Sequence, residues 1–117
     1  MNSKQFVDTI KAVVRDGTIN DVLLVTEIPP GRKVSQQLKA RAEWYRSLPE
    51  EQKEFIKSIV SDAADSALFG FLCVLDGVRA VENGPEKGRF ELRYLNTESI
   101  QLNSQDDAML HDLYNTI

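Results

Sequence analysis

The two side chains best suited to acid–base or nucleophilic chemistry, a histidine and a cysteine, occur once each in this sequence. His111 as a general base would need a nucleophile such as Cys73 close to it in space. Cys73 stands in the apolar stretch from Ala67 to Leu75, which hides a thiol from solvent and keeps it unreactive. We therefore expect a buried, inert Cys73, and a His111 at the surface or at the end of its helix.

Two carboxylates form the clearest pair. Asp62 and Asp65 are three residues apart in a predicted helix and share one face of it. Such a pair can bind a metal or act as acid and base, but a two-metal site in a helix bundle also needs Glu-x-x-His motifs, which the sequence lacks. We expect a solvated or partner-binding face here, with no metal and no cofactor.

The sequence carries none of the strings that mark well-known enzyme classes. It has no GxxxxGK[ST], GxGxxG, GxSxG or HExxH motif. These absences remove the well-marked classes, and we predict that the chain is not an enzyme.

A basic and aromatic segment suggests a different chemistry, a surface that contacts phosphates and stacks on bases. Its members are Arg32, Lys33, Lys39, Arg41, Trp44 and Arg46. Glu43 can pair with Lys39 along the same helix, and an ordinary solvated helix surface has the same composition. Nucleic-acid binding through this segment is the second hypothesis.

Acidic residues dominate the rest of the chain. Residues 32–46 carry five cations and one carboxylate, whereas residues 47–117 carry six cations and thirteen carboxylates, in a chain of net charge −4. Acidic clusters favour association with a basic partner. The candidate partner-binding residues are Asp62, Asp65, Glu82, Glu86, Asp106 and Asp107.

Length and composition bound the class of protein. A chain of 117 residues with 42% hydrophobic side chains corresponds to one domain, residues 1–117. A single cysteine suits a reducing compartment. The longest apolar run has nine residues, Ala67 to Leu75, whereas a membrane span needs about 20. We expect a cytoplasmic protein without membrane contact, of unspecified oligomeric state.

The first half of the chain predicts helices. Ser3 would cap a helix over residues 4–15 that Gly17 ends, and Thr18 to Asp21 resembles a capping box for a further element. Residues 22–28 fit a short helix slightly better than a buried strand. A helix over 34–47 should follow, with Val34, Leu38, Ala42 and Tyr45 facing inward.

The Ser47–Glu50 segment predicts the start of a long helix, with Ser47 as its cap. Its apolar stripe comprises Phe55, Ile56, Ile59, Val60 and Ala63, and the stretch 67–75, apolar all round, should be the buried centre. Gly70 should admit a close neighbour or mark a bend. The helix ends at Asp76–Gly77 or continues to about residue 82.

The hydrophobic period then changes. Residues 89–95 and 99–103 alternate polar and apolar side chains around a polar turn, which indicates a β-hairpin. A short helix over 105–114 should follow, capped by Ser104 and with Asp106 and Asp107 in its first turn. The predicted fold is therefore α+β: a helix-rich single domain with a long central helix, a C-terminal hairpin and a final short helix.

Three segments carry a resemblance to known proteins. Phe69–Val78, Gly88–Tyr94 and Leu110–Asn115 resemble small uncharacterised bacterial domains over about the C-terminal half of the chain. In size, acidity and lack of a catalytic motif, the whole chain is similar in type to immunity proteins of bacterial toxin systems. The resemblance implies no particular functional residue.

The sequence thus favours a protein-interaction domain. Its most concrete form is an immunity-type protein that binds a basic toxin domain and occludes the toxin's active site with an acidic surface. The alternative is a small regulatory or nucleic-acid-associated protein that uses the basic segment. An enzyme that works through His111 is the third hypothesis.

Overall fold

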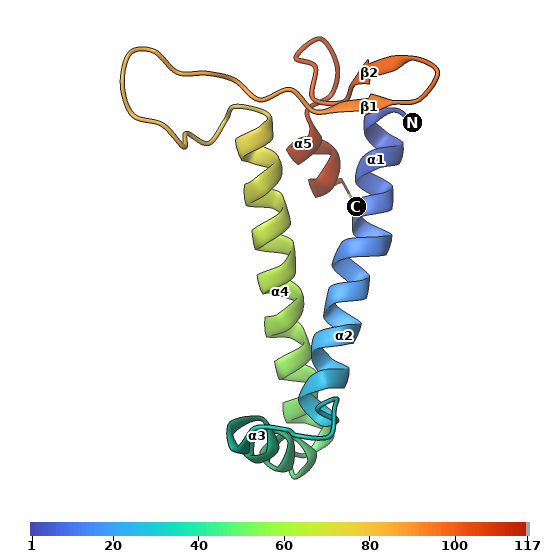
Figure 1. Cartoon of the computed structure of the whole chain (residues 1–117), viewed down its shortest axis with the longest axis vertical. Helices are drawn as coiled ribbons and strands as arrows, with labels where there is room; N and C mark the ends of the chain where they lie inside the picture. The colour runs from blue at the N-terminus through green and yellow to red at the C-terminus, as the bar shows by residue number, and fades with distance from the viewer. Residues whose placement is uncertain (117) are drawn as a thin grey trace.

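The computed structural model describes residues 1–116, and they form the predicted α+β fold: 59% of the chain is helical and a two-stranded hairpin completes it. Two long helical rods run antiparallel and are joined at one end by a helix that crosses them (Figure 1). The elements in chain order are α1 (Ser3–Thr9), η1 (Ile10–Arg15), α2 (Asp16–Glu27), α3 (Gln36–Arg46), α4 (Glu50–Leu75), β1 (Arg93–Leu95), β2 (Ser99–Gln101) and α5 (Leu110–Asn115).

The N-terminal rod is one continuous helix, because α1, η1 and α2 follow one another without a break. The predicted stop at Gly17 and restart at Thr18–Asp21 are therefore wrong, and residues 22–27 are helical. Its N-cap is Asn2, whose side chain forms a capping box with Gln5. Ser3, the predicted cap, is buried instead and donates its hydroxyl proton to the Leu102 carbonyl over 2.7 Å.

The middle of this rod, η1, is a π-helix, which holds about one extra residue in a turn. Val7 and Ile19 are twelve residues apart and would lie about 120° apart around a regular helix. The wider turn brings them back into phase, and both are buried, at 1% and 5% exposure. The π-segment thus lets one rod bury side chains at both of its ends.

The structure corrects both caps predicted for the later helices. Ser47 is the C-cap of α3, and its hydroxyl donates to the Trp44 carbonyl, while Pro49 precedes the first residue of α4. At the C-terminus, α5 begins at Leu110 and not at residue 105. Ser104, Asp106 and Asp107 lie in the preceding loop, where the Ser104 hydroxyl accepts a hydrogen bond from the Asp106 amide.

The long helix α4 ends at Leu75, with Asp76 as C-cap and Gly77 in the left-handed conformation at φ +77°. Gly70 does admit a close neighbour. A Cβ atom at this position would stand 2.3 Å from Nη1 of Arg79, which follows the helix and folds back over it. The hairpin is short, with Tyr94 opposite Ile100 in the antiparallel register.

The main core lies at the hairpin end of the rods, where α1, α4 and α5 meet. Val7, Leu72, Leu110 and Tyr114 form it, and Phe6, Leu68, Phe69, Leu75, Leu92 and Leu113 pack around it. Cys73 is buried, as predicted. At the other end Ala42 and Tyr45 of α3 are buried, also as predicted, together with Ile19 of α2.

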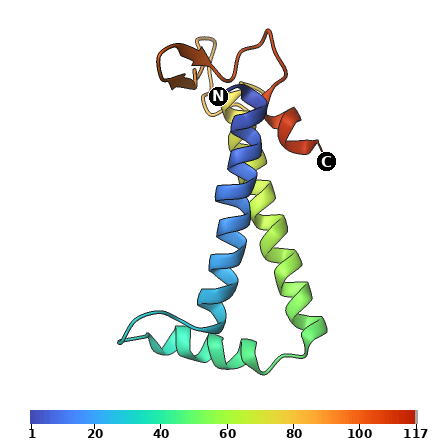
Figure 2. The same ribbon diagram turned by 90° about the vertical axis from the view of Figure 1, so that its right-hand side faces the viewer.

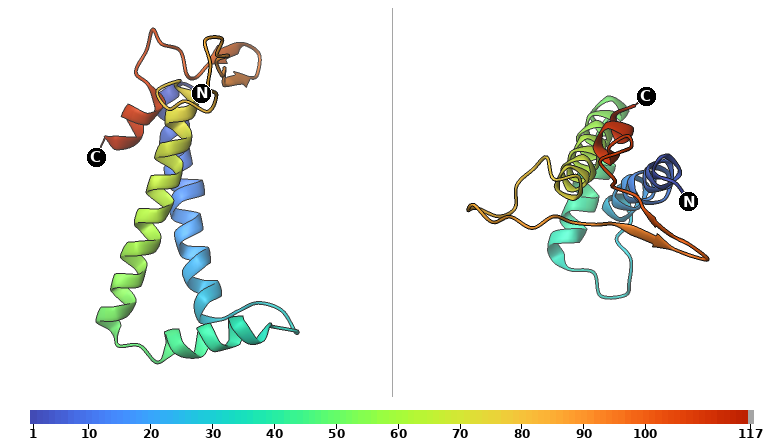
Figure 3. Two further views of the ribbon diagram at one scale, coloured as in Figure 1. Left: turned by 90° about the vertical axis from the view of Figure 1, so that its left-hand side faces the viewer. Right: turned by 90° about the horizontal axis from the view of Figure 1, so that it is seen from above.

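The molecule is extended. Its principal dimensions are 51 × 36 × 30 Å, and α3 lies at the opposite end of the long axis from the hairpin (Figures 1 and 2). Seen from above, α5 lies beside α4 and the hairpin projects to one side (Figure 3). Much of α4 remains uncovered, so the predicted buried centre is only partly correct: Leu72 is buried, but Ala67 and Phe71 are exposed.

Candidate functional site

The two members of the predicted acidic pair, Asp62 and Asp65, have different surroundings. Asp65 is held by Arg15: Nε and Nη2 donate to its two carboxylate oxygens over 2.6 and 3.1 Å. The Tyr114 hydroxyl also donates to Asp65, over 2.7 Å. Asp62 is exposed. Asp65 therefore joins η1, α4 and α5 and is not a free carboxylate for a partner.

Electrostatics keep this cluster in one protonation state at neutral pH. The hydrogen bonds from Arg15 hold the pKa of Asp65 below its ordinary value, and burial together with the bond to Asp65 raises the pKa of Tyr114 to about 12. The pKa of Arg15 is raised by Asp65 and Asp16. The ionised Asp65 and Arg15 form a structural ion pair, and the neutral Tyr114 hydroxyl adds a hydrogen bond to the same carboxylate.

An open cleft of about 560 Å³ lies beside this cluster. Lys11 lines it and makes two contacts of its own: Nζ donates to the Thr116 carbonyl over 3.0 Å and stands 5.1 Å from the centre of the Tyr114 ring. The cations of the cleft are therefore occupied by the chain itself. The cleft is the polar boundary along which α5 packs against the two rods.

A second buried cluster involves the histidine. Nδ1 and the backbone amide of His111 both contact Oδ2 of Asp76, at 2.7 and 2.9 Å. The Asp76 side chain is 1% exposed and that of His111 14%, and His111 is the second residue of α5, so the prediction of a histidine at the surface or near the C-terminus of its helix is wrong. Oδ1 of Asp76 is buried without a partner among the described residues. Because Asp76 caps α4 and His111 opens α5, the pair fixes α5 to the end of α4.

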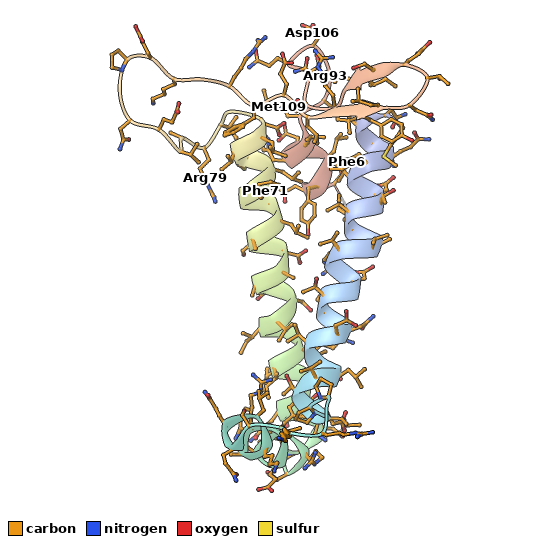
Figure 4. The ribbon with its side chains drawn as sticks, in the orientation of Figure 1. Phe6, Phe71, Arg79, Arg93, Asp106 and Met109 are labelled. Carbon is orange, nitrogen blue, oxygen red and sulfur yellow. The ribbon has the colours of Figure 1, made fainter. Side chains whose placement is uncertain are left out.

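The remaining predicted acids lie beyond α4. Glu82 accepts a hydrogen bond from the Gly88 amide, and Asp107 accepts one from the Ala108 amide. Glu86 and Asp106 are exposed, and Figure 4 shows Asp106 at the end of the molecule opposite to α3. Asp62 lies fourteen residues before Asp76, which is about 21 Å along the helix. The six predicted residues therefore do not form a single acidic patch.

The basic segment is likewise divided. Arg32 and Lys33 lie in the loop before α3, and Arg46 donates to the Glu27 carbonyl at the end of α2 over 2.7 Å. Lys39 lies with Glu43 and Arg46 along one cleft, whereas Arg41 and Trp44, three residues apart, share a different face of α3. Trp44 is 53% exposed. The cations thus do not make one continuous strip.

No cluster of potential metal ligands assembles within residues 1–116. Groups of three or more His, Cys, Asp or Glu side chains that could hold a metal are absent from this part of the chain. Its only cysteine is buried, and its histidine is bound to Asp76.

The exposed apolar surface of α4 is the feature that sequence reasoning missed. Phe55, Ile59 and Phe71 are 62%, 67% and 58% exposed, and Ala63 and Ala67 between them are exposed too. We call these five residues, spaced by four, the α4 row. Phe55, Ile59 and Ala63 belong to the apolar stripe predicted for this helix, and Ala67 and Phe71 belong to its predicted buried centre. Their apolar character is visible in the sequence, but a stripe that faces a partner has the same period as a stripe that faces the core.

Comparison of the chain with protein-family models, with curated proteins and with solved structures gives no match.

Proposed function

We propose that this chain is a protein-interaction module. The observation that supports it is the α4 row, in which five exposed apolar side chains follow one another along a single helix. Apolar patches of more than a few hundred Å² are rare on monomeric soluble proteins and mark sites of association. Such a module acts by covering its apolar helix face with another polypeptide.

The immunity-type inhibitor is the specific form that we propose for a basic partner. The loops beyond α4 support it, because residues 76–112 carry eight carboxylates and four cations. Glu82, Glu86, Asp106 and Asp107 belong to this acidic end, and Asp65 does not contribute because Arg15 and Tyr114 already engage it. The acidic end would attract a basic toxin domain and contact it through these carboxylates. We place this complex in the cytoplasm.

A membrane is the competing environment for an apolar helix. Within the described residues, α4 is the one helix long and apolar enough to cross a bilayer, by length and composition alone. Two observations favour protein over lipid. Asp62 is exposed near the middle of α4, and the rod beside it carries Asp8, Lys11, Arg15 and Asp16 within its length. Charged side chains at the centre of a bilayer are costly.

Site-specific photocrosslinking in cells tests the proposal. A photoreactive phenylalanine analogue replaces Phe55 or Phe71 in the α4 row, and as a control it replaces Phe90, which is 51% exposed on the segment before β1. We expect discrete cross-linked protein products from the two row positions and a much weaker yield from Phe90. An intact chain that gives no protein product at either row position would contradict the proposal, and sedimentation with membranes would favour the lipid alternative.

A further inference from the structure

The α4 row has a regular geometry. Each step of four residues advances about 40° around the helix axis, so the row winds through about 160° from Phe55 to Phe71 over sixteen residues, about 24 Å along α4. Ala63 and Ala67 stand two positions before and after Asp65, so they lie on the opposite side of α4 from the Asp65–Arg15 ion pair. The face of α4 that holds the chain together is thus distinct from the face that the row exposes.

The chain has more accessible surface than a compact monomer of its mass. The chain has an accessible surface of 8615 Å², whereas a folded monomer of 13.2 kDa has roughly 6,400 Å². Its radius of gyration is 18.6 Å, against roughly 13 Å for a compact domain of this length. The excess of roughly 2,200 Å² lies within the range that each subunit of an obligate homodimer buries.

We propose that a second copy of this chain covers the α4 row, in a two-fold symmetric dimer whose α4 helices pack head to tail and cross at Ala63. The inference rests on the proposed function and specifies its partner. Rows of residues spaced by four are the ridges that interlock in the commonest class of helix packing. Small side chains at the crossing point allow the two helix backbones to approach closely.

The side chains of the row complement themselves in this arrangement. Ile59 and Ala67 are each four residues from Ala63, so a head-to-tail crossing sets Ile59 against the partner's Ala67. A bulky residue then meets a small one at both contacts, while Phe55 and Phe71 flank them. A parallel crossing would oppose Ile59 to its own copy and Ala67 to its own copy, which leaves a clash at one contact and a gap at the other.

Charge favours the same orientation. At one end of the long axis, residues 32–46 carry five cations and one carboxylate; at the other end, residues 76–112 carry eight carboxylates and four cations (Figure 1). A head-to-tail dimer directs the basic end of each copy toward the acidic end of the other. A parallel dimer would place like charges together, which is unfavourable.

Light scattering of the purified chain measures the predicted dimer directly. We expect a mass of twice 13.2 kDa for the wild type, and a monomer for Ala63→Glu because a carboxylate would be buried at the crossing. The dissociation constant should rise at least about 100-fold. Ala80→Glu, at an exposed site outside α4, adds the same charge and should leave the dimer intact. Circular dichroism establishes that both variants are folded.

Disulfide formation tests the contact at Ala63 and the head-to-tail orientation of the two α4 helices, with cysteine substitutions that add no charge to the interface. In a Cys73→Ala background, Ala63→Cys should form a disulfide-linked dimer. Ile59→Cys mixed with Ala67→Cys should form a mixed dimer, with little product from either variant alone. A self-linked Ile59→Cys dimer would overturn the head-to-tail orientation.

Two results would overturn the second copy as the occupant: a wild type that is monomeric at all concentrations, or a dimer that Ala63→Glu does not weaken. A monomer whose Phe55 cross-links to a different protein in cells overturns this inference and leaves the proposed function standing. A monomer that cross-links to nothing overturns both.

Discussion

Arg15, Asp65 and Tyr114 show how single residues decide what this chain can do. Asp65 resembled a binding residue in the sequence because it shares a helix face with Asp62, yet its partners come from positions 50 residues earlier and 49 residues later. Such long-range pairs leave no periodic trace in a single sequence. Cys73 was predictable because its neighbours in sequence are also its neighbours in the core.

The Asp65 cluster gives stability a defined pH dependence. The pKa of Asp65 in the folded state lies below its unfolded value near 3.8. Its contribution to the free energy of unfolding is therefore fully present above the unfolded pKa and disappears as the pH falls through the folded pKa. At high pH the opposite sign applies, because the pKa of Tyr114 is raised in the folded state. The contribution of Tyr114 to the free energy of unfolding is present below pH 10 and disappears as the pH rises through the folded pKa of about 12. Both partners are partly exposed, and the acid-side contribution should be about 1 kcal/mol.

Urea unfolding of the wild type and of Asp65→Asn at about 4 pH values between pH 2.5 and pH 7 measures the contribution of Asp65 to the free energy of unfolding. The difference in free energy of unfolding between the two proteins should be largest at neutral pH and shrink toward acid. A difference that is constant across the range would show that the ion pair does not stabilise the fold.

The hydrogen bonds between His111 and Asp76 give His111 a structural role, so its replacement should lower the stability of the fold. His111→Ala removes one of two donors to a buried carboxylate oxygen and should lower the free energy of unfolding by about 2 kcal/mol. Asp112→Ala is the control, because its carboxylate is 71% exposed and stands 3.3 Å from the other ring nitrogen. The control should change stability by less than about 0.5 kcal/mol. Equal effects of the two substitutions would refute the structural role of the buried pair.

At the scale of elements, the long helix, the hairpin and the final short helix were predictable, because each has a hydrophobic period of its own, whereas the π-segment was not predicted and the pattern of residues 22–28 fits a short helix only slightly better than a strand. The residues at which the helices begin and end were less predictable. Gly17 resembled a helix end, but the π-segment before it restores the phase of the buried residues and carries the helix onward. The final helix starts late, since Ser104 and its neighbours use their polar groups in a loop.

Because the N-terminal rod is one continuous helix, the same substitution, glycine to alanine, should have opposite effects on stability at Gly17 and at Gly77. Gly17 lies inside a helix with open space where a Cβ would stand, so Gly17→Ala should stabilise the protein by about 0.5–1 kcal/mol. Gly77→Ala should destabilise it by about 1 kcal/mol or more, because φ at Gly77 is +77°. Thermal unfolding of the two variants beside wild type measures both signs. Destabilisation by Gly17→Ala would restore the sequence-based end of the helix.

At the scale of the whole molecule, the sequence correctly indicated many apolar residues but not where they lie. Patterning distinguishes apolar from polar positions, and it assumes that an apolar stripe faces the chain's own core. Among residues 1–116 the rods pack against one another, α3, α5 and the segments that flank the hairpin, and Phe55 and Ile59 remain outside these contacts. A stripe that faces a partner and a stripe that faces a core have the same period.

The central claim is that the α4 row is covered in the native protein. Hydroxyl-radical footprinting with mass spectrometry measures the accessibility of three phenylalanines whose exposure in the isolated chain is similar: Phe55 at 62%, Phe71 at 58% and Phe90 at 51%. The account predicts that Phe55 and Phe71 react several-fold more slowly than Phe90, and that Ala63→Glu removes the difference. Three similar rates in the wild type at high protein concentration would contradict it.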